Sequence, residues 1–534
     1  MNREVRDSRT PFAKPTGGRT SGRYRRVLLL SFVLSGLLVG CESQEAGTIP
    51  AARTMSKVAV LASSDSTGDL LSIQAGAGLA AEIGHWLTRV PNLVVRLGAT
   101  EGPGGDAAPE ELAARLDVSH IVRVQVSPAE DQWNATWEVV EVHGVSGEAA
   151  SRTVSLEELP GLPPGIARDV LAALGKADLA RDALSGMPLP EDPDAYRALL
   201  LLLGQDVGHP VGAEAWRQRL QALEAVVQGL SGYPPAVTEL GTTYLDLAGL
   251  IGGTGPYYEL AGETLEEAFA LDPGYPPARD ELASYLAKVG RSEEAVALLR
   301  EGIAHHPSFP GFYEHLGYVL RYAGFMEESM ESYRKSQELN RSLDHLVSSQ
   351  DQITKSLIYL GDYGAALISH RRTEGYLQEL GRPANEKQHF YQGVIHLYAG
   401  DLDEAVASFE RGIAVDPTSV WSIFGQGYRG MAEGNREDVA EVLDRLEERV
   451  VVDGERHYRL VHFAAFLDEP ERALEHLTVA VEGGFFNAPY IASDPLTAGI
   501  RGGAVFQAPL NDAEDRRSRI QATNPQDPDQ GPEG

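Results

Sequence analysis

A pattern of large and small residues that returns every 34 positions constrains the fold of this chain more than any other feature. The clearest copies place Leu282, Ala283, Leu286 and Gly290 at the same relative positions as Leu316, Gly317, Leu320 and Gly324. Gly400 and Gly434 mark two further copies, again 34 residues apart. A helix pair of this length cannot bury its apolar face alone, so neighbouring copies must stack. The period predicts an α-solenoid of helix pairs.

This pattern resembles the tetratricopeptide repeat (TPR) family, whose helix pairs place small residues where the helices touch. Weaker copies around Leu240, Gly361 and Leu460 bring the expected number to about eight pairs within residues 190–510. A coincidental helical-bundle period is the alternative.

The end of the predicted array, residues 468–510, resembles the C-terminal cap of proteins that join a TolB-like domain to TPR repeats. Phe485 and Phe486 are expected to cover the last repeat, because a terminal repeat must hide its apolar face. Residues 511–534 are rich in Asp, Pro and Gln, and this composition predicts a disordered acidic tail.

A different pattern occupies residues 56–176, where short β-type runs alternate with segments of helical periodicity. The predicted strands are 57–61, 92–97, 120–126 and 133–142, and the predicted helices are 76–90, 109–116 and 161–174. This order predicts a small mixed sheet covered by helices. The expected fold class is therefore α/β plus all-α, a small mixed-sheet α/β domain followed by a TPR α-solenoid of helix pairs.

The amino-acid sequence of residues 56–176 resembles that of the N-terminal domain of the periplasmic protein TolB. The resemblance rests on Gly78-Leu79 and on the runs at 89–95 and 113–122, and it fails at Ala62-Ser63-Ser64. It implies a binding or assembly domain. Gly76-Ala77-Gly78 also fits part of a dinucleotide fingerprint, but fourteen residues separate it from the strand, whereas that fingerprint follows its strand directly. We interpret these glycines as small packing residues at a helix start.

The N-terminal residues have the order of a secretory signal. Three arginines precede an apolar run from Val27 to Val39, which is short for a hydrocarbon core about 30 Å thick. Leu38, Val39, Gly40 and Cys41 then resemble the lipobox of bacterial lipoproteins. The resemblance implies a signal peptide over residues 1–40, acylation of Cys41 and a lipidated tether over 41–55. A short signal anchor is the alternative.

The implied location is the cell envelope, with the body of the protein held at a membrane by its lipid and facing the periplasm. Glu42 replaces the aspartate that retains many lipoproteins in the inner membrane, so the resemblance favours the outer membrane. Two or more acyl chains anchor a protein stably, whereas one chain binds only marginally.

The charge of the chain disfavours nucleic acid as a partner. Residues 1–40 carry eight Lys or Arg and two acidic residues, so the remainder of this chain of net charge −31 has a formal charge of −37. Such a body repels phosphates. Cys41 is the only cysteine, which excludes a disulfide within the chain.

TPR arrays bind peptides along a groove formed by the first helix of each pair. This precedent implies a protein-binding groove containing Asp280, Ser284, Glu314, Tyr318, Arg321 and Phe390. Asp280 and Glu314 stand where repeats that grip a terminal carboxylate carry cations. A basic or mixed apolar peptide is therefore the expected ligand.

The sequence contains no nucleophile-elbow, HExxH or P-loop motif, so we expect no enzyme, cofactor or metal site. The leading interpretation is a membrane-anchored lipoprotein that acts as a protein-interaction scaffold through its TPR repeats. The alternative is a regulatory or sensory lipoprotein whose α/β domain binds a small ligand and signals through the array.

Overall fold

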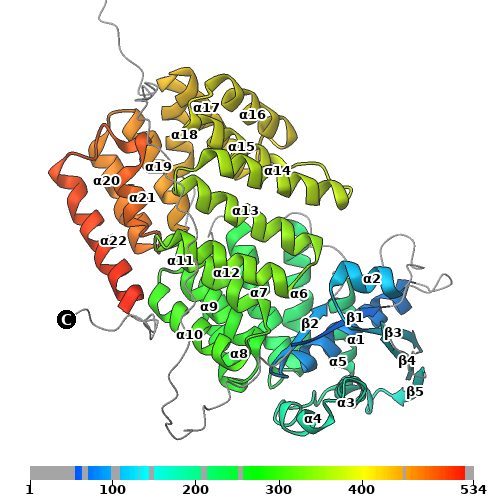
Figure 1. Cartoon of the computed structure of the whole chain (residues 1–534). Coiled ribbons are helices and arrows are strands. Elements are labelled where there is room, and N and C mark those ends of the chain that lie inside the picture. The colour runs from blue at the N-terminus through cyan, green and yellow to red at the C-terminus, as the bar shows by residue number, and fades with distance from the viewer. Residues whose placement is uncertain are drawn as a thin grey trace, which may run out of the picture. The chain divides into compact units, whose positions relative to one another are not determined.

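The computed structural model describes residues 55–62, 70–97, 109–129, 131–142, 149–205, 213–250, 256–448 and 453–522. A five-stranded sheet with its helices is followed by a stack of helix pairs (Figure 1). The predicted signal peptide, Cys41 and nearly all of the predicted tether lie outside the described residues. No helix in the described part of the chain combines the length and apolarity that crossing a bilayer requires.

The sheet is mixed, as the sequence predicts. Its strands are β1 (Ser56–Ala62), β2 (Leu93–Leu97), β3 (His120–Pro128), β4 (Gln132–Glu141) and β5 (Ala150–Ser155), in the order β2-β1-β3-β4-β5. Strands β2 and β3 pair in parallel with β1, whereas β3, β4 and β5 pair antiparallel. Strand β5 was not among the predicted strands, and its only buried side chain is that of Val154.

The helices of the α/β region are α1 (Leu70–Thr88), α2 (Pro109–Leu116), α3 (Leu162–Ala173) and α4 (Ala177–Ala183), with a short 3-10 turn at Leu159–Gly161. Helix α1 begins at Leu70, so Gly76 and Gly78 lie within the helix and not at its start. A Cβ atom at Gly78 would lie 1.8 Å from the carbonyl oxygen of Leu200 in the first repeat helix. The interpretation as packing residues is confirmed, and the predicted helix start is wrong.

The described residues contain eight helix pairs, which agrees with the predicted number. They are α5 (Pro193–Gln205) with α6 (Ala213–Gly229), α7 (Pro234–Leu250) with α8 (Tyr257–Leu271), α9 (Pro276–Lys288) with α10 (Ser292–His305), α11 (Pro310–Tyr322) with α12 (Met326–Leu339), α13 (Leu343–Tyr359) with α14 (Tyr363–Glu379), α15 (Glu386–Ala399) with α16 (Leu402–Val415), α17 (Val420–Glu433) with α18 (Arg436–Glu447), and α19 (Gly454–Phe466) with α20 (Pro470–Glu482).

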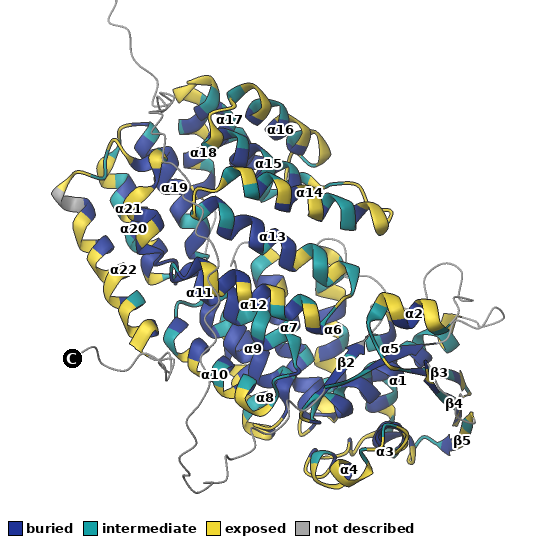
Figure 2. Cartoon of the chain, viewed as in Figure 1, coloured by how far each residue is buried: buried dark blue, intermediate teal, exposed yellow. Residues whose placement is uncertain are grey.

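Repeat glycines end several first helices in the left-handed conformation. Gly290, Gly324, Gly400 and Gly434 have φ between 74° and 84°, a region that other residues adopt at a steric cost. Figure 2 shows buried residues on the facing sides of neighbouring helices and exposed residues along α14 and the outer edge of the last helix. The period of the sequence thus corresponds to stacked helix–turn–helix units.

The C-terminal segment consists of α21 (Ala488–Ser493), a 3-10 turn (Pro495–Thr497) and α22 (Ala504–Ala522). The predicted disordered tail is therefore wrong for residues 511–522. The reason is a buried stripe at helical spacing, formed by Ala513, Arg516 and Ile520, with at most 8% of each residue exposed. Residues 523–534 lie outside the described residues.

The α/β region is fixed to the repeats where α1 packs on α5, a contact that we call the junction. The carboxylate of Glu82 is completely buried there and accepts hydrogen bonds from the hydroxyls of Tyr196, at 3.0 Å, and Tyr233. The Nδ1 atom of His85 lies 3.1 Å from the same carboxylate. Neutral donors thus surround most of this buried charge.

The repeat array also closes on itself, at a second contact that we call the closure. The amide of Phe486 donates to the carbonyl of Tyr322 at 3.0 Å, and Asn487 donates to the carbonyl of Arg321 at 3.4 Å. In the same place, Nη1 of Arg321 lies 3.2 Å from Oε2 of Glu455 on α19. Helices α11 and α19, four pairs apart along the chain, therefore face each other across the inner side of the array.

Candidate binding site on the inner face of the repeats

The structure brings four of the six predicted groove residues together. Asp280 and Ser284 lie on α9, and Glu314 and Tyr318 lie on the neighbouring helix α11. Ser284, Glu314 and Tyr318 line one opening, which we call the inner-face notch. Its complete lining is Ser284, Lys288, Glu314, His315, Tyr318, Tyr333 and Gln352.

The inner-face notch has a volume of about 200 Å³. Sites that enclose a whole drug-sized molecule measure roughly 300–1,000 Å³, so the notch has room for one side chain of a larger ligand. Tyr333 forms part of its lining, and its hydroxyl is buried without a hydrogen bond of normal geometry among the described residues.

The first charged pair at the notch joins Asp280 to His315. Nδ1 of His315 lies 2.8 Å from Oδ1 of Asp280, of which 4% is exposed. Burial disfavours the imidazolium, but pairing with Asp280 raises the pKa of His315 to about 9. Burial also raises the pKa of Asp280, although His315 opposes this shift. The carboxylate of Asp280 therefore stabilises the positively charged form of His315.

The second pair joins Glu314 to His345, whose Nδ1 lies 3.2 Å from Oε2 of Glu314. Burial opposes ionisation of Glu314, but the hydrogen bond from His345 keeps its pKa below the usual value. The carboxylate of Glu314 is therefore kept in its charged form by its histidine partner. Beside them, burial raises the pKa of Glu281 to about 7.

These pairs change the expected charge of the groove. Asp280 and Glu314 were expected to make the groove acidic, but each carries a histidine partner. The ammonium of Lys288 also faces the notch and donates to Ser284 Oγ at 3.0 Å. The walls thus present charges of both signs, and the side chain of Glu314, 27% exposed, is the carboxylate within reach of a ligand.

The other two predicted groove residues are not on an accessible surface, so the prediction is wrong for them. Arg321 is 0% exposed, and besides Glu455 its guanidinium contacts Oε1 of Gln352 at 3.2 Å. Phe390 is 1% exposed. Five aromatic rings have centroids within 6.3 Å of the Phe390 ring, those of Tyr391, Phe409, Trp421, Phe424 and Tyr428. The closure buries Arg321, whereas the rings around Phe390 belong to its own helix pair, α15 and α16, and to the next helix, α17.

Sequence reasoning missed the charged centre of the closure. Besides Arg321, the carboxylate of Glu455 contacts Arg459 at 2.9 Å and Lys355 at 3.8 Å. Despite burial, these cations keep the pKa of Glu455 well below its ordinary value, whereas burial lowers the pKa of Lys355 to about 8. The spacing of Glu455 and Arg459, one helical turn apart and beside apolar Leu460, was the available sequence signal.

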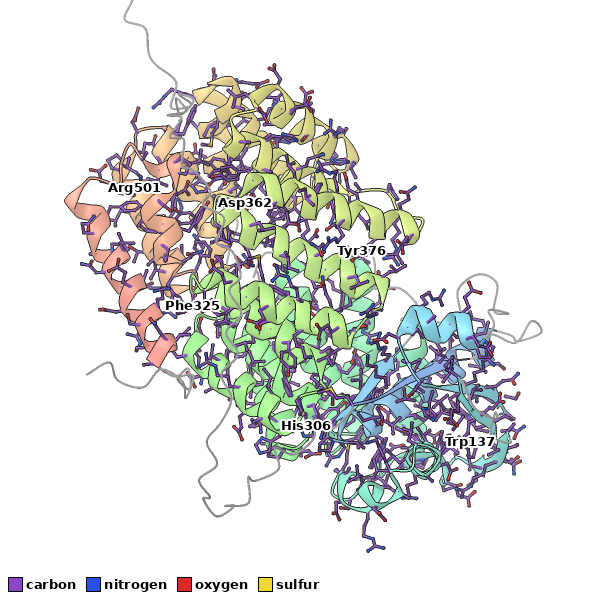
Figure 3. The ribbon with its side chains drawn as sticks, viewed as in Figure 1. Trp137, His306, Phe325, Asp362, Tyr376 and Arg501 are labelled. Carbon is purple, nitrogen blue, oxygen red and sulfur yellow. The ribbon has the colours of Figure 1, made fainter. Side chains whose placement is uncertain are left out.

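Side chains fill the space between the inner helices (Figure 3). Within the described ranges, no group of three or more His, Cys, Asp or Glu residues is arranged to hold a metal ion. The features of the candidate site are therefore its ion pairs and its small opening.

No protein-family model and no curated protein sequence matches this chain. Among solved structures, it is similar to a thermophilic TPR protein from Thermus thermophilus, with 19% identity, a TM-score of 0.30, and coverage of 38% of this chain and 98% of that one. A TPR protein from Parabacteroides merdae gives 14% identity, a TM-score of 0.34, and coverage of 53% and 98%.

PilW, a type IV pilus biogenesis factor, gives 13% identity, a TM-score of 0.33, and coverage of 39% of this chain and 90% of that one. The fold assignment rests on the helix pairs of the chain itself. They form a TPR-like solenoid, preceded by a small mixed five-stranded sheet.

Proposed function

We propose that this chain is a lipid-anchored TPR scaffold of the bacterial cell envelope that binds a partner protein at the inner-face notch. The observation that carries the proposal is the arrangement of charges there. Two carboxylate–histidine pairs hold groups of both signs around an opening of about 200 Å³. Fixed charged groups at a partly enclosed surface favour specific recognition of a partner.

The ligand that fits best is a peptide segment that inserts a basic side chain beside Glu314. The carboxylate of Glu314 remains partly exposed, and the body of the chain has a formal charge of −37, which attracts a cationic segment over distance. Lys288 and His315 would then receive a neighbouring carbonyl or carboxylate of the same segment. This refines the basic or mixed ligand expected from the sequence.

Site-specific crosslinking tests the binding proposal. A photoreactive residue replacing Lys288 is expected to capture one envelope protein, and Glu314→Lys is expected to abolish the capture while Glu314→Asp retains it. A photoreactive residue replacing Glu267, exposed on α8, serves as the control. Capture at both positions, or capture that survives Glu314→Lys in a folded protein, would contradict the proposal.

The anchor is supported by the sequence alone. A basic cluster, a short apolar run and the lipobox-like Leu38 to Cys41 precede the acidic body, and the precedent favours the outer membrane facing the periplasm. Intact mass and membrane fractionation of the wild type and of Cys41→Ala test it. Acyl mass on the wild type, absent from the variant, is expected. If the wild type is soluble and unmodified, the proposed lipid anchor is wrong and only the scaffold function remains.

The sensory alternative is favoured by the junction. The TolB-like resemblance of the α/β region implies a binding domain, and its helix α1 is packed against α5 through Gly78 and Glu82. A ligand that moved α1 would therefore act directly on the first repeat. Hydrogen exchange of the whole chain with a candidate ligand would test this function: protection extending from α1 into α5 would support it, and no change in α5 would exclude it.

A further inference from the structure

A larger pocket lies away from the inner-face notch, where α10, α11 and α12 meet the end of α22. We call it the α12–α22 pocket; its volume is about 690 Å³. This size falls within the range of roughly 300–1,000 Å³ that is typical of small-molecule sites. The pocket could enclose much of an organic molecule, which the notch could not.

The floor of the α12–α22 pocket is apolar. Leu316, Leu320, Phe325 and Ile520 all form part of its lining, and each is at most 9% exposed. Phe325, labelled in Figure 3, begins the turn into α12, and the guanidinium of Arg517 lies 4.4 Å from the centre of its ring. An apolar ligand on this floor would be removed from water on several sides.

Helix α22 forms a fixed wall of this pocket. Its Arg516 donates to the carbonyl of Gly290 at 2.5 Å, and its Arg519 pairs with Glu293 on α10 at 3.1 Å. Ile520 follows directly and is 1% exposed. The pocket is thus formed before any ligand arrives, which reduces the ordering that binding requires.

Charged groups are distributed unevenly around the pocket. Arg300, on α10, is a half-buried cation in its wall, and burial lowers its pKa. The carboxylates of Glu328 and Glu331 stand on exposed positions of α12 at the rim. The lining also includes Arg334, Lys335 and Glu338. Of these six charged residues only Arg300 and Lys335 are half-buried, and both are cations, although the protein as a whole is acidic.

We propose that the α12–α22 pocket binds a free organic anion with an extended apolar body, of the fatty-acid kind. Its carboxylate contacts Arg300, and its hydrocarbon chain lies on Leu316, Leu320, Phe325 and Ile520. A charge-assisted hydrogen bond to the guanidinium supplies orientation. Burial of the chain supplies most of the affinity. This site is separate from the notch, so it does not depend on the proposed protein partner.

Calorimetric titration of the purified chain with dodecanoate in detergent-free buffer tests the proposal. We expect one dodecanoate per chain, and no binding of butanoate, which lacks the apolar body. Arg300→Gln should weaken binding about tenfold, as expected for loss of one charged hydrogen bond, and Arg300→Lys should restore part of it. Glu331→Trp places a large ring over the pocket from an exposed position and should abolish binding.

Arg371→Gln, on an exposed position of α14, removes the same charge elsewhere and should leave dodecanoate binding unchanged. Thermal unfolding of each variant shows that it is folded. The proposal is overturned if the wild type binds no dodecanoate, or if binding survives Glu331→Trp. It is also overturned if Glu331→Trp changes only the binding of anionic phospholipid vesicles, because the pocket would then contact a membrane. A change in oligomeric state alone would overturn it too, because a second copy of the chain would then occupy the pocket.

Discussion

The junction and the closure each bury one glutamate where segments distant in sequence meet, but they surround it differently. At the junction, Glu82 is held by two tyrosine hydroxyls and a histidine. At the closure, Glu455 is held by Arg321, Arg459 and Lys355 as well as by tyrosines. One contact buries a single carboxylate among mostly neutral donors, and the other buries a cluster with more cations than carboxylates.

This difference determines what each contact loses when its glutamate is changed. If the carboxylate of Glu82 is replaced by an uncharged amide, the buried tyrosine hydroxyls can still donate hydrogen bonds to the amide oxygen, so the loss of stability is small. Buried cations that lose their carboxylate leave uncompensated charge, which costs much more. The closure is therefore the contact on which the stability of the array depends more strongly.

The same substitution at both sites gives the largest expected effect. Glu455→Gln should lower the free energy of unfolding by about 3–5 kcal/mol, because it leaves Arg321, Arg459 and Lys355 without their shared negative charge. Glu82→Gln should lower it by only about 1–2 kcal/mol, because the amide oxygen still accepts from the tyrosines. Urea-induced unfolding measures both, with Glu471→Gln on the exposed start of α20 as the control. Equal losses of stability in the two variants would show that the cations around Glu455 do not make the closure more sensitive than the junction.

Glycines provide the next test, because Gly78 at the junction and Gly290, which lies beside the closure against the end of α20, each leave no room for a side chain. A Cβ atom at Gly78 would lie 1.8 Å from the Leu200 carbonyl oxygen, and one at Gly290 would lie 2.2 Å from that of Glu482. Alanine should destabilise either position by about 1–3 kcal/mol through overpacking. Gly290→Ala should cost more than Gly78→Ala, because Gly290 also has a φ of +80°.

Gly375 on α14 is the matched control for these two glycines. Nothing lies within 4 Å of the position that its Cβ atom would take, so Gly375→Ala should raise stability by up to about 1 kcal/mol through helix propensity alone. Thermal unfolding of the three variants separates the effects. A stable Gly78→Ala protein would mean that α1 can move away from α5, and the junction would then be a loose contact.

The sequence predicted the local units better than their arrangement. The 34-residue period identified the helix pairs and their glycine turns, because each unit contacts mainly its neighbours. It carried no information about curvature, which depends on pairs such as Arg321 with Glu455, 134 positions apart in the chain. Arg321 was therefore placed in a groove although the closure buries it, and Phe390 was placed there although the rings of its own and the next helix pair bury it.

Two of the other errors have local causes. Composition predicted disorder for residues 511–522, but the spacing of Ala513, Arg516 and Ile520 already indicated one buried helical face. Strand β5 was missed because it is an edge strand with a single buried side chain, Val154, so its period is too weak to recognise. For the notch, three of the predicted residues share one opening, but the histidine partners of Asp280 and Glu314 come from neighbouring helices that no local pattern links.

The smallest expected effect is a difference in pH dependence between the two contacts. Burial lowers the pKa of Lys355 at the closure to about 8, below its unfolded value of 10.5. A lysine with a lowered folded pKa binds fewer protons in the folded state, so the stability that it costs is recovered as the pH rises from 8 toward 10.5.

Tyr196 and Tyr233 at the junction keep their protons throughout this range, because burial raises each pKa well above 10. The stability of the wild type relative to Lys355→Met should therefore rise by about 1 kcal/mol between about pH 7.5 and about pH 9. The same comparison of the wild type with Glu82→Gln should show no such rise. Chemical unfolding at several pH values measures both differences. If stability rises equally in both comparisons, the rise comes from charges spread over the whole acidic chain. The buried lysine would then not explain the pH dependence of the closure.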